Sequence, residues 1–132
     1  MKAFTASNSP WDSKVNFVDD NNVLVGYDLT QYCCERAGWF VSDIQPILDK
    51  WLPEKEEQPD EIPGFNFDPE FRYTSVDEEE SDRDVQNFIV FRLVNAETKE
   101  EKFLCLYNCH NGYYAHGFDF EVPGLVSESG LL

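Results

Sequence analysis

Apolar and polar residues alternate along much of the chain, which is the pattern of half-buried β-strands. This alternation covers residues 14–18 and 23–29, which flank the turn-forming residues 19–22 (DDNN), so we expect an antiparallel hairpin there. Residues 37–41 are apolar and aromatic and predict a short strand packed on that hairpin. Residues 1–13 are rich in Ser and Asn and are expected to be a loose lead-in.

The clearest alternation lies in the C-terminal half. Residues 86–95 and 101–109 predict two strands, and Asn111-Gly112 favours a type I′ turn, because both central residues of that turn need a positive φ. A return strand over residues 113–122 then completes a three-strand antiparallel meander.

The hairpin over residues 103–122 collects unusual side chains on one face, because successive side chains of a strand point to opposite faces. That face is predicted to carry Phe103, Cys105, Tyr107, Cys109, Tyr114, His116, Phe118 and Phe120. Both histidines of the chain, at positions 110 and 116, lie in this hairpin. We interpret the face chiefly as the aromatic floor of the fold, with His116 as its one polar exception.

One segment has helical spacing. Its apolar residues recur every three or four positions and are Ile44, Ile47, Leu48 and Trp51. Ser42-Asp43 offers an N-cap, so we expect a helix over residues 44–52 that docks on a sheet and ends at Pro53. Strands, one helix, an acidic crossover and a meander together predict an α+β fold with an antiparallel sheet.

The segment between the predicted helix and the predicted meander is strongly acidic. The chain has 132 residues, fits one domain and carries a formal net charge of −16. Residues 53–85 are expected to form an acidic loop insertion with a short strand over residues 71–76, and residues 124–132 a tail. The candidate binding residues of the insertion are Glu54, Glu56, Glu57, Asp60, Glu61, Asp77, Glu78, Glu79, Glu80 and Asp82. Such a field repels phosphate backbones, which argues against direct nucleic-acid binding, and it speeds encounter with a basic protein.

The sequence also bears on the compartment. No apolar run is long enough for a signal peptide or a membrane span, so we expect a cytoplasmic protein whose thiols stay reduced.

Zinc is the first chemistry to consider, because thiolate and imidazole are its preferred ligands. The candidate ligands are Cys33, Cys34, Cys105, Cys109 and His116. However, Cys105 and Cys109 would lie about 13 Å apart on an extended strand, too far to bind one ion without a bulge. We therefore expect no cofactor. The alternative is that these cysteines are small buried apolar residues among aromatics.

A Cys/His nucleophile is a second possibility for the same residues. Cys109 and His110 are adjacent on a strand and point to opposite faces, so they do not form a dyad. Burial among aromatics also disfavours the thiolate. No catalytic residue is assigned.

Two short motifs carry a resemblance. They are Cys33-Cys34-Glu35, within residues 31–39 (QYCCERAGW), and Asn111-Gly112-Tyr113-Tyr114. The chain resembles an uncharacterised bacterial and phage domain family in which a Cys-Cys-Glu triplet follows a strand and an Asn-Gly-Tyr-Tyr hairpin closes the domain. The resemblance covers residues 14–45 and 86–121. It implies one compact domain interrupted by a loop, a role for both motifs in the fold, and no catalytic residues.

Size and charge favour a non-enzymatic interaction module that binds a basic protein, as inhibitors and immunity proteins of nucleases and DNA-mimic proteins do. The alternative is a metal- or thiol-dependent enzyme that uses Cys33, Cys34, Cys105, Cys109 and His116. A third reading is that the charge only keeps the chain in solution.

Overall fold

The computed structural model describes residues 1–9, 12–30, 36–45, 57–76, 85–110, 116–124 and 127–132. In this part of the chain every regular element is a β-strand. The strands are β1 (Lys2–Ser9), β2 (Asp12–Val18), β3 (Leu24–Asp28), β4 (Arg36–Ser42), β5 (Phe65–Val76), β6 (Val85–Asn95), β7 (Glu101–His110), β8 (Gly117–Glu121) and β9 (Glu128–Leu131).

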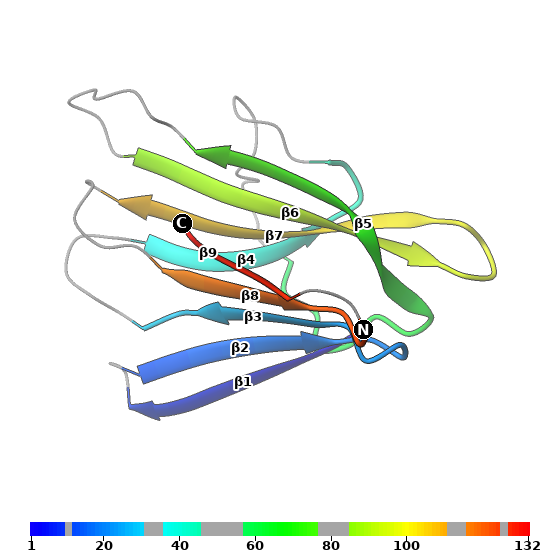
Figure 1. Cartoon of the computed structure of the whole chain (residues 1–132), viewed down its shortest axis with the longest axis horizontal. Helices are drawn as coiled ribbons and strands as arrows, with labels where there is room; N and C mark the ends of the chain where they lie inside the picture. Colours follow the sequence, from blue (N-terminus) through cyan, green and yellow to red (C-terminus); the bar gives the residue numbers. More distant parts are fainter. Residues whose placement is uncertain (10–11, 31–35, 46–56, 77–84, 111–115, 125–126) are drawn as a thin grey trace.

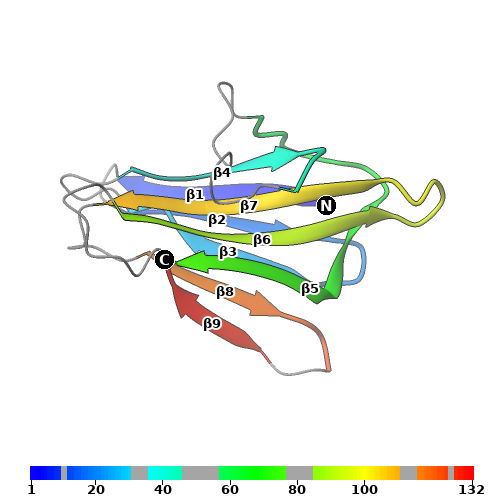
Figure 2. The ribbon, with the colours of Figure 1, turned by 90° about the horizontal axis from the view of Figure 1, so that it is seen from above.

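The strands form two antiparallel sheets. Sheet A has the order β1-β2-β3-β8-β9 and sheet B the order β4-β7-β6-β5 (Figure 1). The sheets lie face to face, as the view in Figure 2 shows. In sheet B three consecutive strands form hairpins, and β4 lies beside β7 at the far edge. This is the strand order of a Greek key.

The expected α+β fold with a docked helix is wrong, because no helix occurs among the described residues. Residues 43–44, at the start of the predicted helix, form a bend that follows β4. The Ser42 hydroxyl accepts a bond from the Ile44 N–H at 3.1 Å and donates one to the Ile44 carbonyl oxygen at 2.8 Å. Ser42 therefore holds a local turn instead of capping a helix, and Ile44 is 78% exposed instead of docked. Residues 46–52 lie outside the described part.

The pairing of the first predicted hairpin is confirmed. Strands β2 and β3 pair with Val15 opposite Tyr27 and Phe17 opposite Val25. The strand predicted over residues 37–41 is β4, and the predicted pairing of residues 86–95 with residues 101–109 is that of β6 with β7. Alternation with a turn between neighbouring segments was sufficient to predict the two hairpin pairings, and an apolar, aromatic run was sufficient to predict β4.

The third strand of the predicted meander is placed wrongly. Strand β8 does not pair with β7; it pairs with β3 in sheet A, with Phe120 opposite Val25. Phe120 then packs against Phe91 of sheet B, with 5.2 Å between ring centroids. Burying this aromatic between the sheets favours the long-range pairing over a local hairpin. The predicted turn at Asn111-Gly112 lies outside the described residues.

The segments expected to be irregular also contain strands. The lead-in contains β1, the acidic insertion contains the long strand β5, and the tail contains β9. Met1 and Leu132 are both buried. The strand expected over residues 71–76 is therefore the second half of a longer one. A register shift between Phe67 and Arg72 interrupts its pairing with β6.

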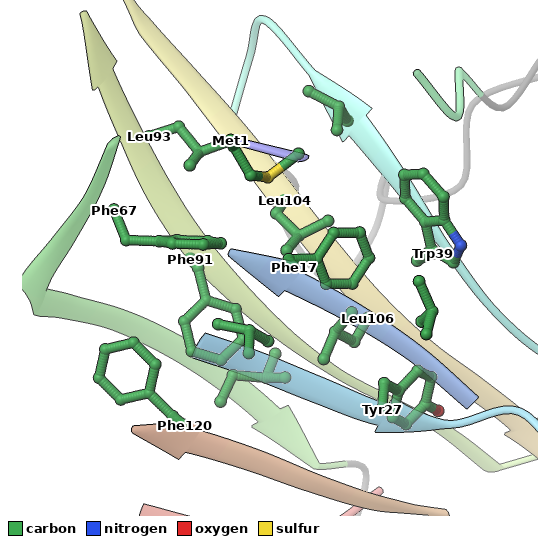
Figure 3. Close-up of a cluster of buried hydrophobic side chains, with 14 of the residues drawn as sticks. Met1, Phe17, Tyr27, Trp39, Phe67, Phe91, Leu93, Leu104, Leu106 and Phe120 are labelled. Atoms are coloured by element: carbon green, nitrogen blue, oxygen red, sulfur yellow. The ribbon is translucent and has the colours of Figure 1, made fainter. Parts of the chain in front are cut away.

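The main core lies between the two sheets. Figure 3 shows its large side chains pointing toward one another from both sheets. Phe17 of β2 meets Trp39 of β4 edge-on, with ring centroids 4.8 Å apart. The Tyr27 hydroxyl also crosses between the sheets and donates to the Tyr107 carbonyl oxygen at 2.7 Å. This bond satisfies a polar group that would otherwise be buried without a partner.

Sheet B is apolar on its outer face as well. The buried side chains of this outer cluster are Phe40, Phe88, Val90, Phe103, Cys105 and Tyr107. Phe71 and Tyr73 of β5 pack against it. The central strands of sheet B are nearly continuous apolar runs in the sequence, because their side chains are buried on both faces of the sheet.

Asp19 connects the β2–β3 turn to the other sheet. Its side chain is only 6% exposed. One carboxylate oxygen accepts from the N–H groups of Asn21 and Val23 at 2.9 Å each, and the other accepts from the Phe67 N–H at 2.8 Å. The carboxylate thus shapes the turn and ties it to β5.

We predict that Asp19→Asn lowers the free energy of unfolding by about 2 kcal/mol. The amide NH₂ of asparagine replaces one accepting oxygen with a donor, so it cannot accept the backbone N–H that the oxygen accepted. Chemical denaturation measures this loss. The neighbouring Asp20→Asn is the control. Because the Asp20 side chain is exposed, it should change stability by less than about 0.5 kcal/mol. Equal losses in the two variants would contradict the role given to Asp19.

Arg92 organises the outer face of sheet B near β5. Its guanidinium lies 4.5 Å above the Phe71 ring, and its Nε donates to Asp68 Oδ2 at 3.1 Å. The side-chain hydrogen bond from Arg92 is the main cause that lowers the pKa of Asp68 below its ordinary value.

A carboxyl group with a lowered pKa in the folded state stabilises the fold above its unfolded pKa, and this contribution is lost as the pH falls through the folded value. We therefore predict that Asp68→Asn costs about 1 kcal/mol at pH 7 and that the deficit shrinks below about pH 4. Urea denaturation at several pH values measures it. Asp43→Asn removes the partner of Lys102, but Asp43 is 79% exposed, so no measurable cost is expected. A deficit for Asp68→Asn that does not depend on pH would rule out the ionised pair as its cause.

Candidate interaction surface

Residues 57–62, here called the edge segment, join the two sheets along one side of the sandwich. On sheet B, the Val41 N–H donates to the Glu57 carbonyl oxygen at 2.9 Å, and Gln58 Nε2 donates to the Trp39 carbonyl oxygen at 2.8 Å. On sheet A, the segment pairs with the start of β1. The Ala3 N–H donates to the carbonyl oxygen of residue 60 at 2.8 Å. The N–H of residue 62 donates to the Met1 carbonyl oxygen, also at 2.8 Å. Part of the predicted acidic loop is therefore fixed to both edge strands.

The Met1 amino group strengthens this attachment. It donates to the carbonyl oxygens of Ile62 at 3.0 Å and Phe65 at 2.8 Å. Burial lowers the pKa of this amine, although the nearby carboxylates of Asp20, Asp19 and Glu61 act in the opposite direction. The Met1 side chain packs in the core, so the edge segment is anchored by both polar and apolar contacts.

The edge segment carries exposed negative charge. Glu57, Asp60 and Glu61 are all exposed, while the neighbouring Ile62 is buried. Among the described residues, no Lys or Arg nitrogen lies within 4.0 Å of these carboxylates. Their charges are thus held in place by backbone bonds and are not neutralised by a described ion pair.

Several cations of the described residues are engaged elsewhere. Arg72 pairs with Glu128 at 2.8 Å, Lys102 with Asp43 at 2.6 Å, and Lys14 with Asp119 at 3.5 Å. Two cations lie beside the edge segment: Lys2, which is opposite Glu61 in the pairing with β1, and the Met1 amino group, which interacts electrostatically with the Glu61 carboxylate. The three ion pairs named above compensate acids outside the edge segment.

A concavity of about 450 Å³ lies where the edge segment meets β1 and the β2–β3 turn. Its lining includes the carboxylates of Asp20 and Glu61 and the ring of Phe4. Phe4 is 54% exposed, which is unusual for a large aromatic residue. Carboxylates beside an exposed aromatic face form a suitable environment for a Lys or Arg side chain, through charge and cation–π contact.

A second concavity, of about 550 Å³, lies on the outer face of sheet A. Lys14 and Asp119 line it and pair with each other across β3. Gly26 makes this possible, because a Cβ at that position would lie 3.0 Å from Lys14 Cε. This groove holds one lysine and two acids, Asp28 and Asp119, and the lysine is paired with Asp119, so its negative charge is partly compensated by an ion pair, unlike that of the edge segment.

The structure tests only part of the predicted binding set. Glu57, Asp60 and Glu61 lie together on the edge segment. Glu54, Glu56, Asp77, Glu78, Glu79, Glu80 and Asp82 lie outside the described residues. Phe4 and Asp20 are not among the predicted binding residues, because Phe4 lies in the expected loose lead-in and Asp20 in the predicted turn. In the sequence, the only indication of their role is that an aromatic residue and an acid occur in segments expected to be irregular.

The predicted metal candidates do not gather where the structure describes them. Cys105 is buried in the outer cluster of sheet B. His116 instead lies beside Tyr27 of the main core, and its Nδ1 donates to the Asp28 carbonyl oxygen at 2.7 Å. The shared face expected for Cys105 and His116 is therefore wrong, because β7 and β8 belong to different sheets.

The remaining candidates, Cys33, Cys34 and the side chain of Cys109, lie outside the described residues. Within the described part, no group of three or more His, Cys, Asp or Glu residues is arranged to hold a metal ion.

Comparison with protein-family models, curated proteins and solved structures finds no match to this chain. In the described part of the structure, no helix has the length and apolar character needed to cross a membrane.

We predict that Cys105 is inert in the native protein, because its side chain is fully buried and its thiol cannot reach a solution reagent. Alkylation with iodoacetamide, followed by peptide mass spectrometry, should leave Cys105 unmodified until denaturant is added. Rapid native labelling of Cys105 would contradict its placement and support a thiol-based activity.

Proposed function

We propose that this protein is a small acidic interaction module that binds a basic protein through the edge segment and the adjoining concavity. The observation that carries the proposal is the attachment of residues 57–62 to the edge strands of both sheets. Acids on a free loop lose conformational entropy when a partner orders them, whereas acids on a fixed backbone have already lost much of it.

Charge and shape both favour a basic partner. The net charge of −16 attracts cations at long range, which raises the rate of encounter. At short range, Glu57, Asp60 and Glu61 lie on one exposed segment, and the concavity beside Phe4 has room for a Lys or Arg side chain. A phosphate-rich ligand would meet repulsion at the same place.

We predict that the triple variant Glu57→Gln/Asp60→Asn/Glu61→Gln binds a decalysine peptide about tenfold more weakly than the wild type, because fixed charges are lost from the contact. Fluorescence anisotropy with a labelled peptide, at low and at physiological salt, measures the affinity. The substituted side chains are exposed, so the variant should keep the wild-type unfolding midpoint.

A matched variant, Glu70→Gln/Glu97→Gln/Glu100→Gln, removes the same charge from exposed positions on other parts of the surface. It should weaken binding by less than about twofold, since charges beyond a Debye length are largely screened. If the two triple variants weaken binding equally, the charge acts only as a diffuse field and the proposed surface is wrong.

A further inference from the structure

The edge segment covers only the beginning of the β1 edge. The carbonyl oxygen of Met1 and the N–H of Ala3 point away from β2 and bond to residues 62 and 60. Main-chain groups of an antiparallel strand point to the same side at every second residue. Those of Thr5 and Ser7 therefore also point away from β2, and no described strand pairs with them.

Residues 4–6 of this stretch are exposed, and within the described part of the chain nothing gives it the usual protection of an edge strand. Natural edges are commonly guarded by Lys, Pro or a bulge. Residues 4–7 read Phe-Thr-Ala-Ser, and the pairing of β1 with β2 becomes irregular only between Ser7 and Ser9. The exposed ring of Phe4 stands beside the open edge. The stretch is thus a short, regular template for one more strand.

We propose that this edge receives an extended, lysine- or arginine-rich segment of the partner protein as an added antiparallel strand. This inference rests on the proposed function and specifies how the basic partner is held. The edge segment already pairs antiparallel with β1, with Lys2 opposite Glu61. The added strand continues that pairing beyond Asp60, because the next outward-facing residue, Thr5, lies about 7 Å further along β1.

Charge complementarity indicates that the segment bound at this edge is basic. Asp60 and Glu61 lie beside the start of β1, at the end of the open edge, and the acid-lined concavity adjoins Phe4. Glu57 lies further along the same segment, where it bonds to β4. Main-chain bonds to Thr5 and Ser7 supply affinity, and basic side chains that meet these acids supply specificity. A neutral or acidic strand would gain only the main-chain bonds.

The other edges of the sandwich are less suited to this occupant. Strand β4 is bonded to the edge segment at Trp39 and Val41. Strand β5 presents Arg72, whose guanidinium is paired with Glu128 of β9 and lies 5.1 Å from the Phe120 ring centroid. These contacts tie the edges of β5 and β9 to each other and place a cation where a basic strand would approach.

The test uses two peptides of identical charge. One is a capped heptapeptide that alternates lysine and valine, and the other is the same peptide N-methylated at every internal residue, which removes its main-chain donors. The unmodified peptide should bind the wild-type protein about tenfold more tightly than the methylated one. Its binding should slow hydrogen exchange at the Thr5 and Ser7 amides, measured by NMR.

Two proline variants give the matched control. Thr5→Pro removes an outward N–H without breaking the β1–β2 ladder, and it should abolish the preference for the unmodified peptide. Ser129→Pro removes an outward N–H from β9. Its N–H points away from β8 because residues 116 and 132 bond each other in both directions. This variant should keep the preference. If Thr5→Pro does not fold, amide exchange in the wild-type protein decides.

Equal binding of the two peptides to the wild type, or unchanged exchange at Thr5 and Ser7, overturns the added strand and leaves the proposed function standing. Equal loss of peptide binding in the two acid-neutralising triple variants overturns the proposed function itself. Failure of both peptides to bind overturns both.

Discussion

A β-sandwich has four edges, and the backbone groups along each of them need partners or protection. In this protein the edge segment supplies part of the answer on one side, because residues 57–62 bond to β4 of sheet B and to the beginning of β1 of sheet A. The other features of that side depend on this attachment. It buries the Met1 amine, brings Glu61 next to Asp20 around one concavity, and fixes a line of carboxylates at the surface.

Polar bonds between the sheets reinforce an otherwise aromatic core. Asp19 holds the β2–β3 turn against β5, Tyr27 donates to a carbonyl oxygen of β7, and Asn108 donates to the Leu132 carbonyl oxygen at 3.0 Å. Each bond crosses from one sheet to the other at a different place. Apolar packing alone tolerates sliding of one sheet on the other, whereas directional bonds fix their relative position.

The distribution of charge follows from the same architecture. Arginine and lysine side chains on β2, β5, β6 and β7 pair with acids of the strands and loops around them, so much of the surface is locally compensated. The carboxylates of the edge segment form no ion pair with a Lys or Arg of the described residues, although Lys2 and the Met1 amino group lie near Glu61. An enzyme built on Cys105 and His116 receives no support, because these residues belong to separate clusters. The proposed interaction rests on the acidic edge segment and on the adjoining part of the β1 edge, with which no described strand pairs.

Most of the local elements follow from short-range sequence patterns. Alternation predicted β2, β3, β6 and β7, and an apolar, aromatic run predicted β4. Residues 19–22 predicted the first turn, and the acids of residues 57–61 predicted the charged segment. Tertiary structure alone decided which strands are neighbours. Strand β8 pairs with β3, across most of the chain, because burying Phe120 between the sheets outweighs the local Asn-Gly signal. Likewise β1, β9 and the edge segment carry weak local patterns, and they are ordered by backbone bonds to distant strands that no local periodicity encodes.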